Sequence, residues 1–168
     1  MAHPTDNLVV RAARPADLDG LHEINQSAVP GVNSLTRDEF QAVEAMSALT
    51  LVASRRDVVA GFVLAMTEGL TYASLNYRWL SDRYERFAYV DRVAVAPEAR
   101  GAGIGQALYE ALFRQLSGVR PLVLAEVNLS PPNPGSIKFH DRNGFVSVGE
   151  RWNEDRSKGV VFLERALT

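Results

Sequence analysis

APEARGAGIGQAL, residues 96–108, places an arginine and three alternating glycines directly before an apolar run of helical spacing. Glycine weakens the start of a helix, so three of them indicate that something approaches the backbone closely. The unpaired N–H groups and partial positive charge of a helix start favour an anion, and phosphate is the usual one. The stretch therefore predicts a helix over residues 103–116 that begins at a phosphate site, with a plain tight turn as the alternative.

The glycine spacing argues against two nucleotide-binding motifs. A P-loop closes with a lysine followed by Ser or Thr, whereas Gly105 is followed by Gln106 and Ala107. In a dinucleotide-binding turn the third glycine would come one residue later than it does here. Such a turn also opens its fold, but about 90 residues precede this one.

Secondary-structure signals follow the order β-α-α-β-β-β-α-β-α-β-β along the chain. Hairpins come first and a strand-helix-strand unit follows, so we expect an α/β fold of the α+β kind. Its core would be a mixed, mostly antiparallel sheet of about seven strands flanked by about four helices. The predicted strands are 8–12, 49–54, 58–66, 87–95, 122–127, 145–150 and 159–167, and the predicted helices begin after Arg14, after Thr36, at residue 103 and after Asn133.

The composition predicts one domain over residues 1–168 and excludes several kinds of partner. The chain is 46% hydrophobic and carries a net charge of -2, with 18 basic and 20 acidic residues in no like-charged block. Nucleic acid and anionic membranes are therefore poor partners. The absence of cysteine excludes a disulfide framework and an enzyme thioester. His3, His22 and His140 lack ligand spacing, so we expect no metal.

The hydropathy pattern favours a cytoplasmic protein. The first residues, MAHPTDN, are polar, and the longest apolar run, residues 58–66, is too short to cross a bilayer.

Two separated motifs carry a resemblance to a known family. Val95-x-Pro97-x-x-Arg100-Gly-x-Gly-Ile-Gly105 is followed by Asn133-x-x-Ser136-x-x-Phe139 and by the pair Gly144-Phe145. Together they resemble the acetyl-CoA-binding core of the GNAT-type N-acetyltransferases, over roughly residues 89–148. The resemblance implies acetyl-CoA as cosubstrate and direct transfer of its acetyl group to a primary amine of a small molecule or peptide.

The resemblance also implies which residues bind acetyl-CoA. The backbone of residues 93–95 would pair with the pantetheine arm like an added strand, and residues 100–105 would hold the pyrophosphate. Asn133 and Ser136 would contact the arm, although Asn133 could equally be only a helix cap. The expected cofactor-binding residues are Val93, Ala94, Val95, Arg100, Gly101, Ala102, Gly103, Ile104, Gly105, Gln106, Asn133 and Ser136.

Three residues are candidates for proton transfer. Asp91 and Glu126 stand where similar enzymes place an acid that takes the proton of the amine, and ion pairs with basic residues are the alternative for both. His140 replaces the tyrosine that this family usually has as general acid, four residues before Gly144. A histidine can donate a proton near neutral pH, but a packed or solvated residue is the alternative. The thioester would lie between the strands that carry Val93 and Glu126.

The acceptor is less well defined by the sequence. Residues 68–86 have no clean period, so they form either a mobile lid or an ordinary excursion of the chain. We expect Tyr77, Trp79 and Tyr84 to bind the acceptor amine. A non-catalytic acyl-CoA-binding or sensing module and a nucleotide-dependent oxidoreductase are the competing functions. The closing strands could supply the edge of a homodimer.

Overall fold

The computed structural model describes residues 7–168, which form an α/β fold as predicted. In this part of the chain seven strands form one sheet in the order β1-β2-β3-β4-β5-β7-β6. The chain divides into two compact units, and strand β4 (Ala88–Val95) contributes to both. The first unit comprises residues up to 65 together with 92–114, and the second comprises residues 66–91 and 115–168. The single domain and the homodimer remain predictions.

The elements of the two units follow the predicted order with small shifts at their ends. Those of the first unit are β1 (Leu8–Ala12), the 3-10 helix η1 (Pro15–Asp17), α1 (Leu18–Ser27), α2 (Arg37–Ala45), β2 (Leu49–Arg55), β3 (Val58–Thr67), η2 (Pro97–Ala99) and α4 (Ile104–Leu116), with β3 and α4 each ending in the second unit. Those of the second unit are α3 (Leu75–Ser81), β5 (Leu122–Ser130), α5 (Pro134–Arg142), β6 (Val146–Trp152) and β7 (Gly159–Ala166).

In the first unit, helices pack on both faces of the antiparallel strands β1, β2 and β3. On one face, the ring of Phe62 in β3 meets Phe40 of α2 edge-on, with 5.7 Å between the ring centroids. Gly61 points to the other face, because successive residues of a strand alternate. A Cβ on Gly61 would lie 3.0 Å from Ile104 of α4, so the glycine lets this helix approach the sheet closely. The core of the first unit therefore positions the start of α4.

An acidic side chain ties the start of the first helical segment to β1. Asp17 accepts two hydrogen bonds from the guanidinium of Arg11, at 2.7 and 2.9 Å, and one from the backbone N–H of Arg14 at 2.7 Å. The bond from Arg11 is the largest contribution that holds the pKa of Asp17 below its usual value. Asp17 is buried, so its carboxylate charge would destabilise the fold if it were not paired with Arg11.

We expect Asp17→Asn to lower the free energy of unfolding by about 1 to 3 kcal/mol at pH 7, because hydrogen bonds to a charged group are lost. The folded pKa of Asp17 is lowered, so its contribution is present above the unfolded value of about 3.9 and is lost as the pH falls through the folded pKa. The difference between the two proteins should therefore shrink below about pH 4. Denaturant unfolding of both proteins at pH 7 and pH 3 measures this difference in the free energy of unfolding.

Asp19→Asn is the matched control, because Asp19 pairs with Arg37 at the surface and its side chain is 74% exposed. Its effect should stay below about 1 kcal/mol. Equal losses in the two variants would contradict a special role for the Arg11–Asp17 pair.

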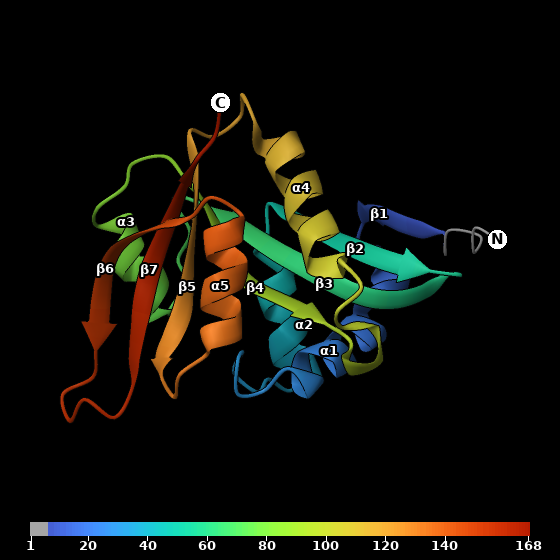
Figure 1. Cartoon of the computed structure of the whole chain (residues 1–168), viewed down its shortest axis with the longest axis horizontal. Coiled ribbons are helices and arrows are strands. Elements are labelled where there is room, and N and C mark those ends of the chain that lie inside the picture. Colours follow the sequence, from blue (N-terminus) through green and yellow to red (C-terminus); the bar gives the residue numbers. More distant parts are fainter. Residues whose placement is uncertain (1–6) are drawn as a thin grey trace. The chain divides into compact units, whose positions relative to one another are not determined.

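In the second unit, β4 pairs in parallel with β5, and β7 pairs antiparallel with both β5 and β6. The predicted closing hairpin is confirmed, with Trp152 of β6 opposite Gly159 of β7. Figure 1 shows α5 alongside β5 and β7. On α5, the ring of His140 packs against Phe145, with 5.1 Å between the ring centroids.

The segment 68–86 contains a helix that the periodicity did not predict, so the described chain has five α-helices rather than about four. Helix α3 is only two turns long and buries just Tyr77 and Leu80, so it has too few apolar residues for a periodic signal. Ser74 caps it by accepting a hydrogen bond from the N–H of Tyr77 at 3.2 Å. The ring of Trp79 on α3 stacks on the ring of Phe162 of β7, with 4.1 Å between the ring centroids.

Candidate active site

The glycine turn between β4 and α4 has a left-handed backbone at two positions. Gly101 and Gly103 both have a φ of +78°, which side chains with a Cβ rarely adopt. A Cβ at either position would meet no atom of residues 7–168 within 4 Å, so the space beside these two glycines is open. Helix α4 begins at Ile104, directly after the second of these glycines. A phosphate site at the start of α4 remains a prediction.

Arg100 adds a positive charge to this turn. Its side chain is exposed, and the guanidinium donates to the carbonyl oxygens of Val95, at 3.2 Å, and Ser27, at 3.5 Å. Both of these acceptors are uncharged carbonyl oxygens. Residues 93–95, from which we expect pairing with pantetheine, end β4 just before the turn. Val93 and Val95 are half-buried, whereas Ala94 between them is buried.

Asp91 and Glu126 belong to a group that we call the acid–tyrosine cluster, made of Tyr72, Tyr77, Tyr89, Asp91 and Glu126. The hydroxyl of Tyr89 donates to Glu126 Oε1 at 2.7 Å, and that of Tyr72 donates to Asp91 Oδ1 at 2.8 Å. The ring of Tyr77 lies between the other two, 5.6 Å from Tyr72 and 5.8 Å from Tyr89. The second unit thus gathers both predicted carboxylates around three tyrosines.

Tyr89 stays protonated at any pH at which the protein would work. Its side chain is 1% exposed. Burial, and then the negative charges of Glu126 and Asp91, raise the pKa of Tyr89 well above its usual value. The hydroxyl is therefore a permanent donor, and the carboxylate of Glu126 is its acceptor. Tyr89 was not predicted as a site residue, but strand alternation places it on the same face as Asp91.

Two further polar residues, Asn76 and Arg151, are linked to this cluster by hydrogen bonds, and no feature of the sequence predicted them. Asn76 of α3 donates through Nδ2 to Glu126 Oε1 at 3.2 Å. The guanidinium of Arg151 on β6 donates to Asn76 Oδ1 through Nε at 3.1 Å and Nη2 at 2.7 Å. These contacts join residues 50 and 75 positions apart, so only the tertiary structure reveals them.

Helix α5 carries the other predicted residues of the second unit. Asn133 caps the helix, as its side-chain oxygen accepts from the N–H of Ser136 at 3.3 Å. His140 is buried, and its Nδ1 lies 2.8 Å from the carbonyl oxygen of Ser136. Because a carbonyl only accepts, Nδ1 carries the proton. Burial lowers the pKa of His140, so the imidazole is neutral at pH 7.

The aromatic residues expected at the acceptor site have different surroundings. Tyr77 is buried, and its hydroxyl donates to the carbonyl of Thr67 at 2.7 Å. Trp79 stacks on Phe162, and the guanidinium carbon of Arg83 lies 3.6 Å from the centroid of its ring. Two groups that close to one ring must cover opposite faces. Tyr84 is half-buried, and its pKa is raised by burial. The binding of an acceptor by these residues remains a prediction.

The predicted site residues fall into both units. Those from Val93 to Gln106 belong to the first, and the second contains Asp91, Glu126, Asn133, Ser136, His140 and the three aromatic residues. Among residues 7–168 no three metal-binding side chains cluster, and His3 lies outside the described residues.

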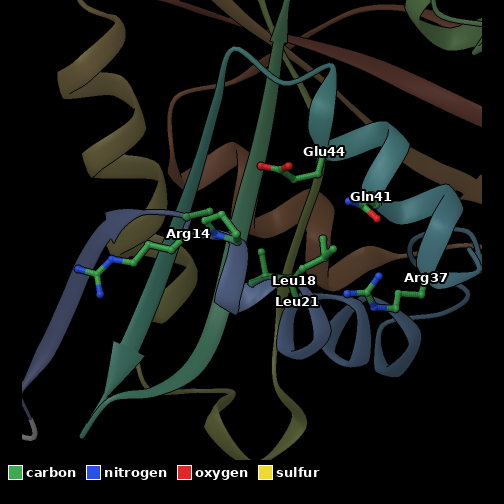
Figure 2. Close-up of a pocket in the computed structure, with 8 residues that line it drawn as sticks. Arg14, Leu18, Leu21, Arg37, Gln41 and Glu44 are labelled. Carbon is green, nitrogen blue, oxygen red and sulfur yellow. The ribbon is translucent and has the colours of Figure 1, made fainter.

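A surface pocket of about 390 Å³ lies in the first unit and contains none of the predicted residues. Figure 2 shows Leu18 and Leu21 of α1 facing polar side chains of α2 around it. The pocket is lined by Ala13, Arg14, Pro15, Leu18, Leu21, Arg37, Gln41 and Glu44.

The fold and the glycine turn match a family of acetyl-transferring enzymes. The model of the acetyltransferase (GNAT) family matches residues 18–145, so the chain belongs to this family. The family uses acetyl-CoA as cosubstrate, which confirms that expectation at the level of the family. No helix in residues 7–168 has both the length and the apolar character needed to cross a membrane.

Individual relatives agree with this assignment. A phosphinothricin N-acetyltransferase of Streptomyces coelicolor is 39% identical over 79 residues, which are 45% of this chain and 46% of that protein. The chain thus spans about half the length of this curated relative. The fold resembles the ribosomal-protein-S18-alanine N-acetyltransferase of Escherichia coli, with a TM-score of 0.74 and 18% identity over 96% of this chain and 94% of that one. It also resembles yncA of Salmonella typhimurium, solved with acetyl-CoA, with a TM-score of 0.70 and 21% identity over 96% and 95% of the two chains.

Proposed function

We propose that this protein transfers the acetyl group of acetyl-CoA directly to a primary amine of a small molecule or peptide. The observation that carries the proposal is the carboxylate of Glu126, which Tyr89 and Asn76 hold by hydrogen bonds of 2.7 and 3.2 Å. An amine must lose a proton to react, and a positioned carboxylate can take it. The chain has no cysteine, so the acetyl group does not pass through an enzyme thioester.

The glycine turn fits the pyrophosphate of acetyl-CoA. Gly101 and Gly103 have no side chain that would keep a phosphate away from the backbone, and Arg100 supplies a positive charge. When bound, acetyl-CoA supplies the acetyl group as an activated thioester. Backbone groups of residues 93–95 would hold the pantetheine arm, and an N–H near Val93 would stabilise the oxyanion. Asn133 and Ser136 would contact the arm from α5.

The residues of the second unit would move the protons. Glu126 takes a proton from the amine as its nitrogen bonds to the carbonyl carbon and the carbon–sulfur bond breaks. Asp91 lies in the same cluster and adds negative charge that favours a cationic amine. His140 would return a proton to the departing thiolate. Its own proton is on Nδ1, against Ser136, so the proton for the thiolate would be the one that the amine gave to Glu126, passed on to Nε2.

We expect His140→Phe to lower kcat about tenfold to a hundredfold, because proton delivery to the thiolate is lost. The Kd for CoA should stay within about twofold. The matched control is His22→Phe in the first unit, where the ring contacts the carbonyl of Leu35 at 2.7 Å, and its kcat should be unchanged. Steady-state kinetics measures both variants. If His140→Phe keeps the wild-type kcat, His140 has only a packing role.

Release of free thiol from acetyl-CoA over an amine panel tests the function. The panel includes phosphinothricin, spermidine, L-lysine and a peptide that begins with alanine, since relatives are named for phosphinothricin and for the S18 alanine. Thiol release with at least one amine supports the proposal. Stabilisation by CoA without release over a broad panel would instead indicate a binding module. Stabilisation by NAD alone would indicate an oxidoreductase, and a ligand at 100 times its Kd adds about 2.7 kcal/mol.

A further inference from the structure

Three side chains from three elements lead to the carboxylate of Glu126 on a fourth element, β5. Arg151 of β6 donates two hydrogen bonds to Asn76 Oδ1, at 3.1 and 2.7 Å. Asn76 of α3 donates to Glu126 Oε1 at 3.2 Å, and Tyr89 of β4 donates to the same oxygen at 2.7 Å. All four residues belong to the second unit. Two donors thus converge on one oxygen atom of the carboxylate.

The direction of the Asn76 amide follows from the chemistry of its neighbours. A guanidinium only donates hydrogen bonds, and an ionised carboxylate only accepts them. The amide oxygen must therefore face Arg151, and the amide NH₂ must face Glu126. In the reverse orientation the NH₂ group would meet the donors of Arg151 and the oxygen would meet the carboxylate, and both contacts would be repulsive. Arg151 consequently decides that Asn76 is a donor toward Glu126.

We propose that Asn76 and Arg151 are positioning residues, which hold the Glu126 carboxylate ionised and in one orientation. The inference rests on the proposed role of Glu126 as the proton acceptor. A hydrogen bond to a carboxylate favours its charged form, and a neighbouring negative charge disfavours it. The other titratable groups of the cluster are Asp91, Tyr72, Tyr77 and Tyr89, and Asn76 supplies a donor that does not titrate. An ionised base is ready to take a proton at neutral pH.

The first test replaces Asn76 by alanine and by aspartate. Asn76→Ala removes the donor, and Asn76→Asp keeps an oxygen for Arg151 but places a second carboxylate against Glu126. The pKa of Glu126 should rise by about 0.5 to 1 in Asn76→Ala and by more in Asn76→Asp. The carbon-13 shift of the Glu126 carboxyl carbon against pH measures it without any substrate. If Asn76 had a purely structural role, the pKa of Glu126 would not rise in this order, because Asn76→Asp keeps the link to Arg151.

The second test asks whether Arg151 acts through Asn76. Arg151→Met should lower kcat about threefold to tenfold, since the amide loses its fixed direction. In the Asn76→Ala background the same change should have almost no further effect. Independent effects, with a raised KM for the acceptor in Arg151→Met, would show that Arg151 contacts the acceptor itself and would overturn the proposal.

The matched control is Asn25→Ala in the first unit, where Asn25 also accepts from a buried arginine, Arg92, at 2.9 Å. This variant should lose stability and leave the titration of Glu126 unchanged. An unchanged Glu126 pKa in both Asn76 variants overturns the positioning role, whatever the activity. If the pKa rises in the expected order but no amine of the panel is acetylated by the wild type, the proposed function fails instead.

Discussion

Gly103→Val raises the KM for acetyl-CoA about tenfold or more and leaves kcat within about threefold. Two effects act on the glycine turn. A side chain at a φ of +78° costs about 1 to 2 kcal/mol of backbone strain, which lowers the stability of the fold whether or not acetyl-CoA is bound. The rise in KM comes from the second effect, and each factor of ten in it corresponds to about 1.4 kcal/mol lost from binding. In the proposed site the new side chain would also enter the space from which the diphosphate approaches the amides of α4, and no atom of residues 7–168 fills that space within 4 Å of the Cβ. Steady-state kinetics with varied acetyl-CoA measures the change.

Gly118→Val separates backbone strain from the loss of a phosphate site. Gly118 has a φ of +79°, and a Cβ there also meets nothing within 4 Å. It follows the end of α4, whereas Gly103 precedes its start. The two variants should therefore lose similar stability, while only Gly103→Val raises the KM. An unchanged KM in Gly103→Val, or an equal rise in both variants, would contradict a phosphate site at the turn.

The second large effect is expected at Glu126. Glu126→Gln should lower kcat at neutral pH by about a hundredfold, within the 10²–10⁴ range of general acid–base catalysis. Glutamine keeps the size of the side chain and an oxygen for the hydroxyl of Tyr89, but it cannot take a proton. The loss should shrink as the pH rises toward the pKa of the amine, about 10.4 for a lysine side chain, because more of the acceptor is then already neutral. A pH series of kcat measures this.

Glu68→Gln is the matched control in the same unit. Glu68 accepts hydrogen bonds from the N–H of Phe87, at 3.1 Å, and from Arg120, at 3.0 Å. Burial raises the pKa of Glu68, but these contacts together outweigh burial and hold the pKa below its usual value. Its amide variant should lose stability but keep kcat within about twofold. Asp91→Asn tests the other carboxylate of the cluster. A wild-type kcat in Glu126→Gln together with a large loss in Asp91→Asn would assign the proton acceptor to Asp91.

Local signals in the sequence were sufficient to predict most of the fold. The hairpin of β2 and β3, the crossover through α4 and the closing hairpin of β6 and β7 were predicted within a few residues. Each depends on neighbours in sequence: a polar turn between apolar runs, or a cap before a helical stripe. The positive φ of Gly101 and Gly103 is likewise a local property, because only glycine adopts it readily. The two-turn helix α3 was missed, since a segment that short gives no period.

The surroundings of the reacting groups depended on contacts between residues distant in sequence. The sequence marked Glu126 as a polar residue within an apolar strand, but it did not show whether its partner is an arginine or a tyrosine. Folding brings Tyr89 of β4 and Asn76 of α3 to one oxygen of this carboxylate, and Arg151 of β6 orients the asparagine. Conformational preference acts between adjacent residues, and so it can be read along the chain. A hydrogen bond between side chains 37 or 75 positions apart exists only after the strands have paired and the helix has packed.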